Sequence, residues 1–567
     1  MKKYVFTGIL FLSVIFVFGQ NEIEKGLSAI TENVVKGQLE FLASDWTEGR
    51  ETGAKGAYMA ADYIASMFKV YGIKPFGDEV VEMPSRRMMM RSGPGFRPKV
   101  DTSYFQNFSL VRYEPGDEQA LDVISNGNVS ERTTHFNYQT DFSFRGGSVA
   151  QSAKAPVVFA GYGLTDEDKG YDDLKNIDVN GKIVVIVSGF PGHKDTASAA
   201  YKKFKPERPG FPFRRRPRGN QFQNIIDKGA VAVIQVSYEE PPTDWSTNQV
   251  YPAKGAYYEA DAPLKSYYDY RMELPGSGNN SGLPVFSVTQ NVFNAIIEGT
   301  NLNLDDFEEY TKENMKPASR ALPGKSISFK TSVKTEIVKV RNVIGMIEGE
   351  KKDEYIVVGG HYDHLGKFDG WIWNGADDNA SGTVGVMTIA KAFAETGKKP
   401  EKSVIFAAWT AEEKGLYGST YFVKQVKEKG MNVILNLNYD MIARDTERDT
   451  AKNQASMQYT EAYPGIRELT EKNIEEYGIN LDLSYRASRQ PGGGSDHAPF
   501  AREGIPIFYF MAAMHPDYHQ PSDELSKVNW DKMIDIIRVG FLNIWNFANS
   551  DEYLIKKEDS SEDASEE

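Results

Sequence analysis

The chain has 567 residues, of which 40% are hydrophobic and 25% are charged, as is typical of a globular protein with two or more domains. It contains no cysteine, which excludes disulfides, thiolate metal sites and cysteine nucleophiles, so any bound metal must use histidine and carboxylate ligands. The formal net charge of −14 argues against a nucleic-acid partner, because a phosphate-binding face needs clustered and uncompensated Lys and Arg.

The first residues have the pattern of a secretory signal peptide. Lys2 and Lys3 precede an apolar run over residues 5–18 that is short for a membrane span, and Gly19 is small enough for cleavage to follow it. We therefore expect residues 1–19 to be removed and the protein to be secreted or periplasmic, without a stable membrane span after processing. An uncleaved N-terminal anchor is the alternative.

The next segment predicts a helix followed by an edge strand. Apolar residues recur at near-helical spacing between Ala57 and Val70, and Gly72 is placed to end the helix. Residues 104–111 alternate aromatic and polar side chains, as an edge strand does. We expect the helix to pack on a sheet.

Residues 117–323 have the sequence pattern of a separate module, with many predicted turns and short strands. The predicted strands are apolar runs at 156–163, 181–187, 230–236 and 283–288. With the turn Gly161-Tyr-Gly163, the strand entry at 180–184 and a helix leading into a strand at 224–230, the module resembles a protease-associated domain, a non-catalytic insert of secreted peptidases. A generic α/β insert is the alternative, since none of these motifs carries chemistry.

After Ser326, strands and helices alternate to about residue 553, which predicts an α/β fold class. The strands are mostly continuous apolar runs, typical of a sheet covered on both faces, and lie at 341–347, 355–359, 403–409, 433–438 and 505–511. Helical patterns lie at 381–396, 415–429, 465–477 and 530–549. The tail at 554–567 is mostly acidic residues and serine, so we expect it to be disordered.

Histidines and carboxylates follow or lie beyond the ends of these strands. In chain order the candidates are His361, the pair Glu412 and Glu413, Asp440 and His519. Because the carboxyl ends of parallel strands converge at one edge of a sheet, residues far apart in sequence can surround one metal centre there.

A two-zinc hydrolytic centre needs a bridging carboxylate, further ligands on each ion and a base for the shared water. The sequence supplies candidates for each part: Asp378 as the bridge, His361 with Asp440 for one Zn²⁺, and Glu413 with His519 for the other. Glu412 could take the proton from the water, because one carboxylate of a consecutive pair can bind metal while its neighbour stays free. For His364, His497 and His515 we expect ordinary loop or substrate-pocket positions.

Six ordered motifs resemble those of the secreted di-zinc aminopeptidases, a family that also includes glutamate carboxypeptidase and the transferrin receptor. They are His361-Tyr-Asp363, Gly375 to Gly382, Trp409 to Gly415, Asn438 to Met441, Gly494 to His497 and Tyr518 to Asp523. The resemblance implies a three-layer zinc-exopeptidase catalytic domain with a mostly parallel central sheet. This domain would consist of residues 20–116 and 324–553, interrupted by the protease-associated insert at 117–323.

The resemblance also implies roles for single residues. It assigns two Zn²⁺ per chain to His361, Asp378, Glu413, Asp440 and His519, general acid/base chemistry to Glu412, and stabilisation of the oxyanion to Tyr518. It implies a cis peptide bond between Asp378 and Asn379. From strand geometry we expect Asp363 to accept the other N–H of His361, and Asp523 to support His519 in the same way.

We predict a zinc-dependent aminopeptidase that removes N-terminal residues from peptide substrates. A carboxypeptidase or dipeptidase on the same centre stays open, because the ligands define hydrolysis and not which peptide terminus is held. A receptor-like binding protein with a vestigial site is the non-enzymatic alternative, and it would be marked by missing ligands. A single-zinc protease site on a helix is excluded because the sequence has no His-Glu-x-x-His motif.

Overall fold

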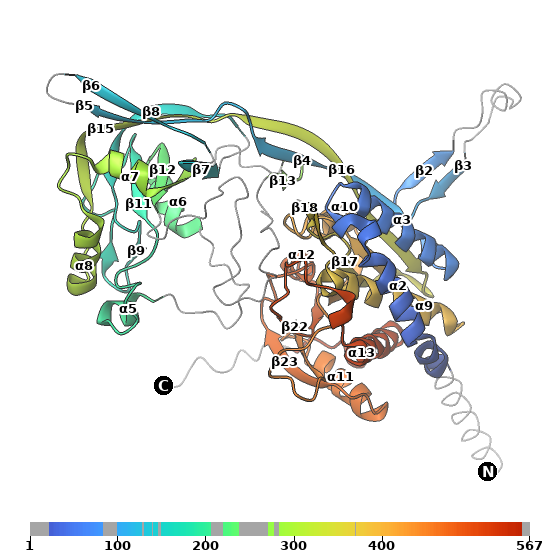
Figure 1. Ribbon diagram of the computed structural model, residues 1–567. Helices are drawn as coiled ribbons and strands as arrows, with labels where there is room; N and C mark the ends of the chain where they lie inside the picture. Colours follow the sequence, from blue (N-terminus) through green and yellow to red (C-terminus); the bar gives the residue numbers. More distant parts are fainter. Residues whose placement is uncertain are drawn as a thin grey trace, which may run out of the picture. The chain divides into compact units, whose positions relative to one another are not determined.

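We describe the fold from a computed structural model (Figure 1), which describes residues 22–82, 99–126, 130–138, 140–145, 149–205, 219–236, 270–276, 283–368 and 370–557. The predicted signal peptide and residues 558–567 of the predicted tail lie outside these ranges. No helix of the described ranges has the length and apolar character needed to cross a membrane.

The chain forms two compact units. The first contains the described residues up to Leu110 and from Val338 onward, and the second contains those between Val111 and Ile337. The boundaries fall within two long strands, β4 (Phe105–Pro115) and β16 (Val333–Ile347), which run from one unit into the other. The predicted limits of the insert, residues 117 and 323, lie inside the second unit.

A large mixed sheet forms the centre of the first unit. Its spatial order is β13-β4-β16-β20-β17-β21-β24-β22-β23, and β1 (Lys74–Pro75) pairs with β16. Strand β13 and the residues 111–113 of β4 with which it pairs belong to the second unit. Strands β20, β17, β21 and β24 are mutually parallel, while β16 and β22 join them antiparallel. The bounds not yet given are β13 (Arg271–Glu273), β20 (Lys402–Trp409), β17 (Lys351–His361), β21 (Asn432–Tyr439), β24 (Ile507–Met511), β22 (Gln454–Thr460) and β23 (Asp482–Ser488).

Helices cover both faces of this sheet. Because neighbouring side chains of a strand point to opposite faces, Ile356 and Val358 of β17 pack into one core while Val357 packs into another. The first core receives α2 (Glu32–Leu42), α3 (Lys55–Val70), α9 (Gly382–Glu395), α11 (Gly465–Glu476) and α13 (Trp530–Asn549), and the second receives α10 (Tyr417–Glu428) and α12 (His497–Arg502). The predicted α/β class with three layers and a mostly parallel central region is confirmed.

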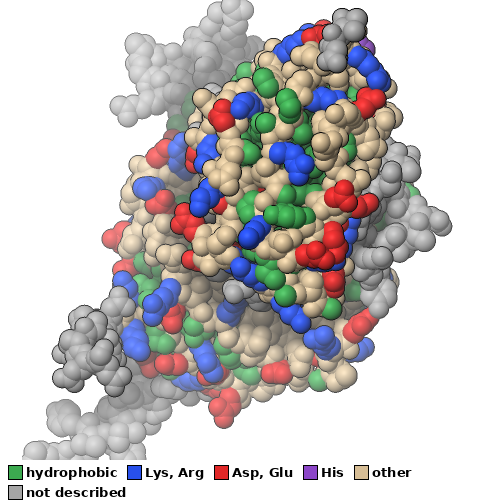
Figure 2. Space-filling view, turned by 90° about the vertical axis from the view of Figure 1, so that its left-hand side faces the viewer, with side chains coloured by type: hydrophobic (Ala, Val, Ile, Leu, Met, Phe, Trp, Pro, Cys, Tyr) green, Lys and Arg blue, Asp and Glu red, His purple; other side chains and the backbone are tan. Residues whose placement is uncertain are grey.

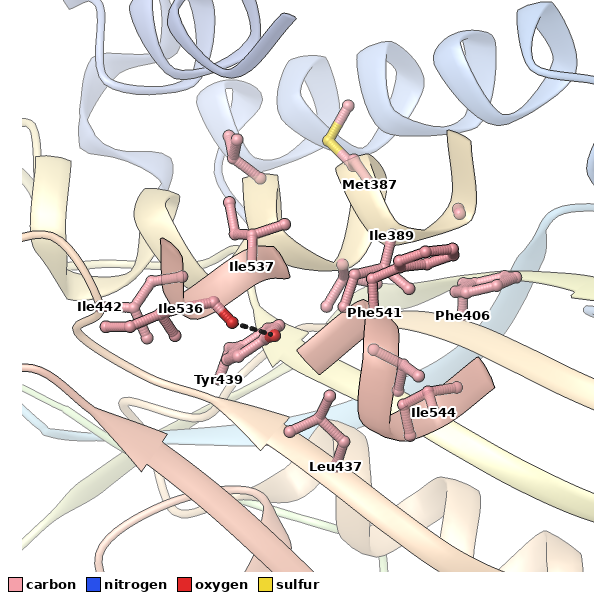
Figure 3. Packing of buried hydrophobic residues seen from close by; sticks show 14 of the residues in the cluster. Met387, Ile389, Phe406, Leu437, Tyr439, Ile442, Ile536, Ile537, Phe541 and Ile544 are labelled. Atoms are coloured by element: carbon pink, nitrogen blue, oxygen red, sulfur yellow. Dashed lines mark hydrogen bonds between the residues drawn. The ribbon is translucent and has the colours of Figure 1, made fainter. Parts of the chain in front are cut away.

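Figure 3 shows how the first core is filled. Ile536, Phe541 and Ile544 of α13 lie against side chains from the sheet and from α9, and all of these residues are buried. The phenol of Tyr439, at the end of β21, donates a hydrogen bond of 3.1 Å to the carbonyl of Ile536. The last helix therefore fixes the end of a strand that leads directly to a predicted metal ligand.

Short elements complete the first unit. They are the 3-10 helices η1 (Asp45–Arg50) and η4 (Leu525–Lys527), the π-helical turn η3 (Ala376–Ser381), and the two-stranded ribbons β2 (Glu79–Glu82) with β3 (Lys99–Thr102) and β18 (Gly366–Phe368) with β19 (Trp371–Trp373). Helix α3 ends as predicted, since Gly72 adopts a φ of 75°, which favours glycine.

The second unit has its own sheet and core. The spatial order is β6-β5-β15-β8-β11-β12-β14-β7, with β8, β11, β12 and β14 parallel. The bounds are β5 (Ala120–Asn126), β6 (Glu131–Phe136), β7 (Phe142–Arg145), β8 (Ser152–Phe159), β11 (Ile183–Val187), β12 (Ala232–Val236), β14 (Val285–Val288) and β15 (Arg320–Lys330), and a separate ribbon pairs β9 (Thr165–Asp166) with β10 (Tyr171–Asp172). The helices are α5 (Ala199–Phe204), α6 (Gly219–Asp227), α7 (Gln290–Ile297) and α8 (Leu304–Asn314). All four predicted strands form, and the protease-associated identity of the unit stays a prediction.

The turn Gly161-Tyr162-Gly163 wraps around the buried carboxylate of Asp173. Its Oδ2 accepts the backbone N–H groups of Tyr162 at 2.9 Å and Leu164 at 3.1 Å. Gly161 has a φ of 53°, and a Cβ there would lie 2.4 Å from Asp173 Oδ1. Glycine is therefore required at position 161 by the geometry around this carboxylate.

The surface drawn in Figure 2 carries both signs of charge. Lys and Arg side chains lie interspersed with Asp and Glu on this face. The expectation that nucleic acid is not a partner stays a prediction from the net charge.

Candidate metal centre

The predicted ligands come from the same edge of the first unit's sheet. Strands β17, β20, β21 and β24 are adjacent and parallel, so the segments that follow their carboxyl ends meet. These segments, with the turn η3, supply His361, Asp378, Glu412, Glu413, Asp440 and His519. The structure brings together all the residues that the sequence predicted for metal binding and acid/base chemistry.

Three oxygen atoms surround Nε2 of His361. Asp378 Oδ1 lies 3.5 Å from it, Asp440 Oδ1 3.6 Å and Glu412 Oε2 3.9 Å. These distances exceed those of hydrogen bonds, and within the described ranges this buried nitrogen has no hydrogen-bond partner. Two ligands of one tetrahedral zinc ion, each about 2.0 to 2.2 Å from it, lie about 3.3 to 3.6 Å apart. The spacing of His361, Asp378 and Asp440 therefore suits ligands that share an ion, whereas Glu412 lies slightly farther away.

The second oxygen of Asp378 faces the other histidine. Nε2 of His519 lies 2.9 Å from Asp378 Oδ2 and 3.4 Å from Glu413 Oε2. Asp378 thus presents one oxygen to each histidine, as a bridging carboxylate must. The peptide bond after it, Asp378–Asn379, is cis, as predicted. The donors are imidazole nitrogens and carboxylate oxygens, and this set fits zinc.

The neighbours Glu412 and Glu413 have opposite electrostatic environments. Burial, together with the nearby carboxylates, raises the pKa of Glu412 well above its usual value, although His361 opposes this. Burial also acts on Glu413, but the adjacent His519 and a hydrogen bond from His364 outweigh it and hold the pKa of Glu413 well below its usual value. Glu412 is therefore the better proton acceptor and Glu413 the better permanent anion.

Tyr518 lies directly against a predicted ligand. Its ring stacks on His519 with centroids 3.5 Å apart. Burial and the surrounding carboxylates raise the pKa of Tyr518 well above its usual value, so the phenol keeps its proton and remains a hydrogen-bond donor.

The two predicted supporting aspartates have other partners. Nδ1 of His361 lies 3.1 Å from the backbone carbonyl of Asp363 and 3.9 Å from its carboxylate, because the strand ends at His361 and the two side chains do not share a face. The carboxylate of Asp363 instead accepts hydrogen bonds from Thr52 Oγ1 at 2.8 Å and from the backbone N–H of Glu412 at 3.1 Å. It positions the loop that carries Glu412.

Asp523 supports the bridging residue and not His519. Its Oδ2 accepts the backbone N–H groups of Asp377 and Asp378, each at 3.0 Å. Its Oδ1 lies 3.4 Å from the guanidinium of Arg444, which also pairs with Asp517. Through Asp523, this buried network is hydrogen-bonded to the backbone of the turn η3.

Arg50 is a site residue whose contacts sequence reasoning did not find. It is fully buried and donates to the backbone carbonyls of Tyr362 at 2.8 Å, Asn374 at 2.6 Å and Gly375 at 2.9 Å, as well as to that of Leu42. Burial lowers its pKa to about 10 against the opposing effect of Asp378 and other carboxylates, so it stays charged. The signal in the sequence was an arginine in the polar run Glu48-Gly49-Arg50-Glu51, which precedes the predicted helix.

The three remaining histidines of this region are buried and not ordinary loop residues. His515 Nε2 lies 3.1 Å from Asp377 Oδ2, and His497 stacks on Tyr509 with centroids 4.6 Å apart. His364 Nδ1 lies 2.8 Å from Glu413 Oε1, and burial lowers the pKa of His364 to about 4. His364, Asp378 and Glu413 together form a group of potential metal donors, as do His361, Glu412 and Asp440.

Comparisons with known proteins match part of the chain to peptidases. Residues 342–541 match the model of peptidase family M28. A glutamate carboxypeptidase 2 homolog of Caenorhabditis elegans is 27% identical over 404 residues, which cover 63% of this chain and 48% of that protein. The leucine aminopeptidase 2 of Trichophyton rubrum is 32% identical over 173 residues, covering 29% of this chain and 32% of that protein. The chain thus spans about half the length, or less, of these curated relatives.

Among solved structures, the aminopeptidase from Aneurinibacillus sp. strain AM-1 has a TM-score of 0.54 and 18% sequence identity. The match covers 95% of this chain and 98% of that one. At this identity the likeness shows a shared fold.

Proposed function

Because residues 342–541 match the model of peptidase family M28, we propose that the protein is a zinc-dependent exopeptidase, and specifically an aminopeptidase acting on peptides. The observation that carries the proposal is the carboxylate of Asp378, which lies between the Nε2 atoms of His361 and His519 with Glu412 beside them. No predicted ligand is missing, which argues against a receptor with a vestigial site.

The proposed centre holds two Zn²⁺. Asp378 would supply a ligand to both ions, His361 and Asp440 would hold one of them, and Glu413 and His519 would hold the other. Bound zinc would polarise the scissile carbonyl and lower the pKa of the attacking water. The two-ion proposal is supported by the two oxygens of Asp378, which face different histidines.

The chain's own groups would move protons and stabilise charge. Glu412, whose pKa is raised, accepts a proton from the attacking water and returns it to the leaving amine. Tyr518, whose phenol stays protonated, donates a hydrogen bond to the oxyanion that forms at the carbonyl carbon.

The charge of the site favours a free N-terminus as the group that is recognised. The described part of the chain has two buried arginines, and both are committed to protein partners: Arg50 to carbonyl oxygens, and Arg444 to Asp517 and Asp523. Neither arginine is therefore available to bind the carboxylate of a substrate. The buried carboxylates gathered at the site instead suit a protonated α-amine. A carboxypeptidase is the second candidate, favoured by the long match to a relative named glutamate carboxypeptidase 2 homolog.

Two substrates separate these candidates. One is an aminoacyl reporter with a free amine, and the other is an N-blocked peptide with a free carboxylate. We expect the purified protein to contain about two zinc ions per chain and to cleave the first substrate only. Cleavage of the blocked peptide alone would assign the protein as a carboxypeptidase, and full activity of metal-free protein would contradict the proposal altogether.

We also propose that the protein is exported, to the periplasm or the medium. The support is the charged start at Lys2 and Lys3 followed by the apolar run over 5–18. N-terminal sequencing of the mature protein should begin after Gly19, and a sequence that begins at residue 1 or 2 would contradict cleavage.

A further inference from the structure

We propose that His364 is a positioning residue that holds Glu413 for metal binding and thereby sets the zinc affinity of the site shared by Glu413 and His519. The inference rests on the proposed function, since it takes Glu413 as a ligand. Its main observation is that Nδ1 of His364 lies 2.8 Å from Glu413 Oε1, while Glu413 Oε2 faces Nε2 of His519 at 3.4 Å. His364 occupies one oxygen of the carboxylate and directs the other toward the ion.

The ring of His364 is itself held firmly. Its backbone N–H donates to the carbonyl of Arg50 at 3.1 Å, and its segment forms an isolated β-bridge with Glu51. On the other side the ring packs against Gly375, where a Cβ would lie 2.4 Å from His364 Cδ2. Gly375 also has a φ of 54°, which favours glycine, and it directly precedes the turn that carries Asp378. His364 therefore touches two of the three ligand-bearing segments of this site, those of Glu413 and Asp378.

The distances favour a hydrogen-bond donor over a further zinc ligand. Nδ1 is at hydrogen-bond distance from Glu413 and is 3.9 Å from Asp378 Oδ2, whereas ligands that share a tetrahedral zinc lie about 3.3 to 3.6 Å apart. The other ring nitrogen, Nε2, is buried and has no hydrogen-bond partner among the described residues. A neutral imidazole with one acceptor carries its proton on the nitrogen that faces that acceptor, here Nδ1.

The hydrogen bond from His364 fixes the orientation of the Glu413 carboxylate. A free carboxylate can bind an ion through either oxygen or both, and its neighbour Glu412 offers a competing carboxylate close by. A donor that is fixed at Oε1 leaves Oε2 as the oxygen for the ion. Loss of such an outer hydrogen bond typically weakens metal binding by about 10-fold to 100-fold.

Zinc affinity in three variants tests the inference. The variants are His364→Leu, which removes the donor, His364→Asn, whose amide nitrogen comes close to the position of Nδ1, and His364→Gln, whose amide lies farther out. Zinc is titrated into metal-free protein against a chromophoric chelator. We expect His364→Leu and His364→Gln to weaken one of two sites by about 10-fold to 100-fold and to leave the other unchanged. His364→Asn should stay within a few-fold of the wild type.

Cobalt substitution separates a donor from a ligand. If His364 is a donor, the visible absorption of the Co²⁺ form of His364→Asn should match that of the wild type, because the ligand set is unchanged. An altered spectrum in this variant, or an affinity loss equal to that of His364→Leu, would overturn the inference and make the ring a ligand. Wild-type affinity in both His364→Leu and His364→Gln would overturn it as well.

Two controls keep the result interpretable. His135→Asn changes an exposed histidine of the second unit, which pairs with Asp122, and should not alter zinc affinity. If His364→Leu fails to fold by circular dichroism, the contrast between His364→Gln and His364→Asn decides the question. A wild type that binds fewer than two zinc ions would instead refute the proposed two-ion centre, so the two failures are distinguishable.

Discussion

At the scale of single residues, Glu412 and Glu413 show how neighbours in the chain acquire different properties. Replacing Glu412 with Gln removes the proposed proton acceptor but keeps the shape of the side chain. We expect Glu412→Gln to lower kcat by about 10²-fold to 10⁴-fold and to leave zinc content unchanged. Steady-state kinetics and metal analysis check this, with the exposed Glu395→Gln as the matched control. Unchanged turnover would reassign the base.

Asp523 is a second residue with a measurable role. Its buried carboxylate accepts hydrogen bonds from the N–H groups of Asp377 and Asp378 and faces Arg444. In Asp523→Asn these two N–H groups have a weaker acceptor, and the buried charge of Arg444 loses one of its opposite charges. We expect the free energy of unfolding of metal-free protein to fall by about 3 kcal/mol. Urea denaturation measures it, with the exposed Asp531→Asn as control. Equal stability of the two variants would show that the network does not stabilise the turn η3.

At the scale of elements, the turn around Asp173 predicts a pH dependence of the second unit. Burial raises the pKa of Asp173 from 3.8 to about 7, so the folded state binds this proton more tightly than the unfolded state. The protonated Asp173 side chain therefore contributes stability that is fully present below about pH 4 and is lost as the pH rises through about 7.

The variant Asp173→Asn isolates this contribution, because the amide does not ionise. We expect the stability of the wild type relative to Asp173→Asn to fall between pH 5 and pH 8. Denaturant unfolding of both proteins at the two pH values measures the difference. A difference that is constant with pH would mean that Asp173 does not carry the proton.

The elements also show how far sequence reasoning extends. The strands that lead to the site were predictable because they are continuous apolar runs, buried on both faces, and their parallel order brings His361, Glu413 and Asp440 to one edge. The roles of Asp363 and Asp523 were predicted wrongly because they depend on where a strand ends and on how loops far apart in sequence fold together. The contacts of Arg50 and His364 depend on the same tertiary geometry, which local periodicity does not encode.

At the scale of the whole molecule, the centre belongs to the first unit, so metal should stabilise that unit alone. Without ions its carboxylates repel one another, and burial together with Glu413 raises the pKa of Asp378 to about 7. Free zinc at 100 times its dissociation constant would add about 2.7 kcal/mol to the stability. In calorimetry, we expect the addition of a chelator to move one unfolding transition to lower temperature and to leave the others in place. A shift of every transition, or of none, would contradict this assignment.

The contacts of Arg50 have a consequence for the order in which the protein matures. Arg50 leaves the ribosome before the second unit, while its partners Tyr362, Asn374 and Gly375 are synthesised after it, separated from Arg50 by more than 300 positions in the sequence. Such long-range closure is slow compared with local folding. The second unit can therefore fold during synthesis, whereas the metal site forms only after residues 362–375 have been made and have closed on Arg50. A fragment limited to residues 342–541 would lack this arginine, which is hydrogen-bonded to the loops of the site.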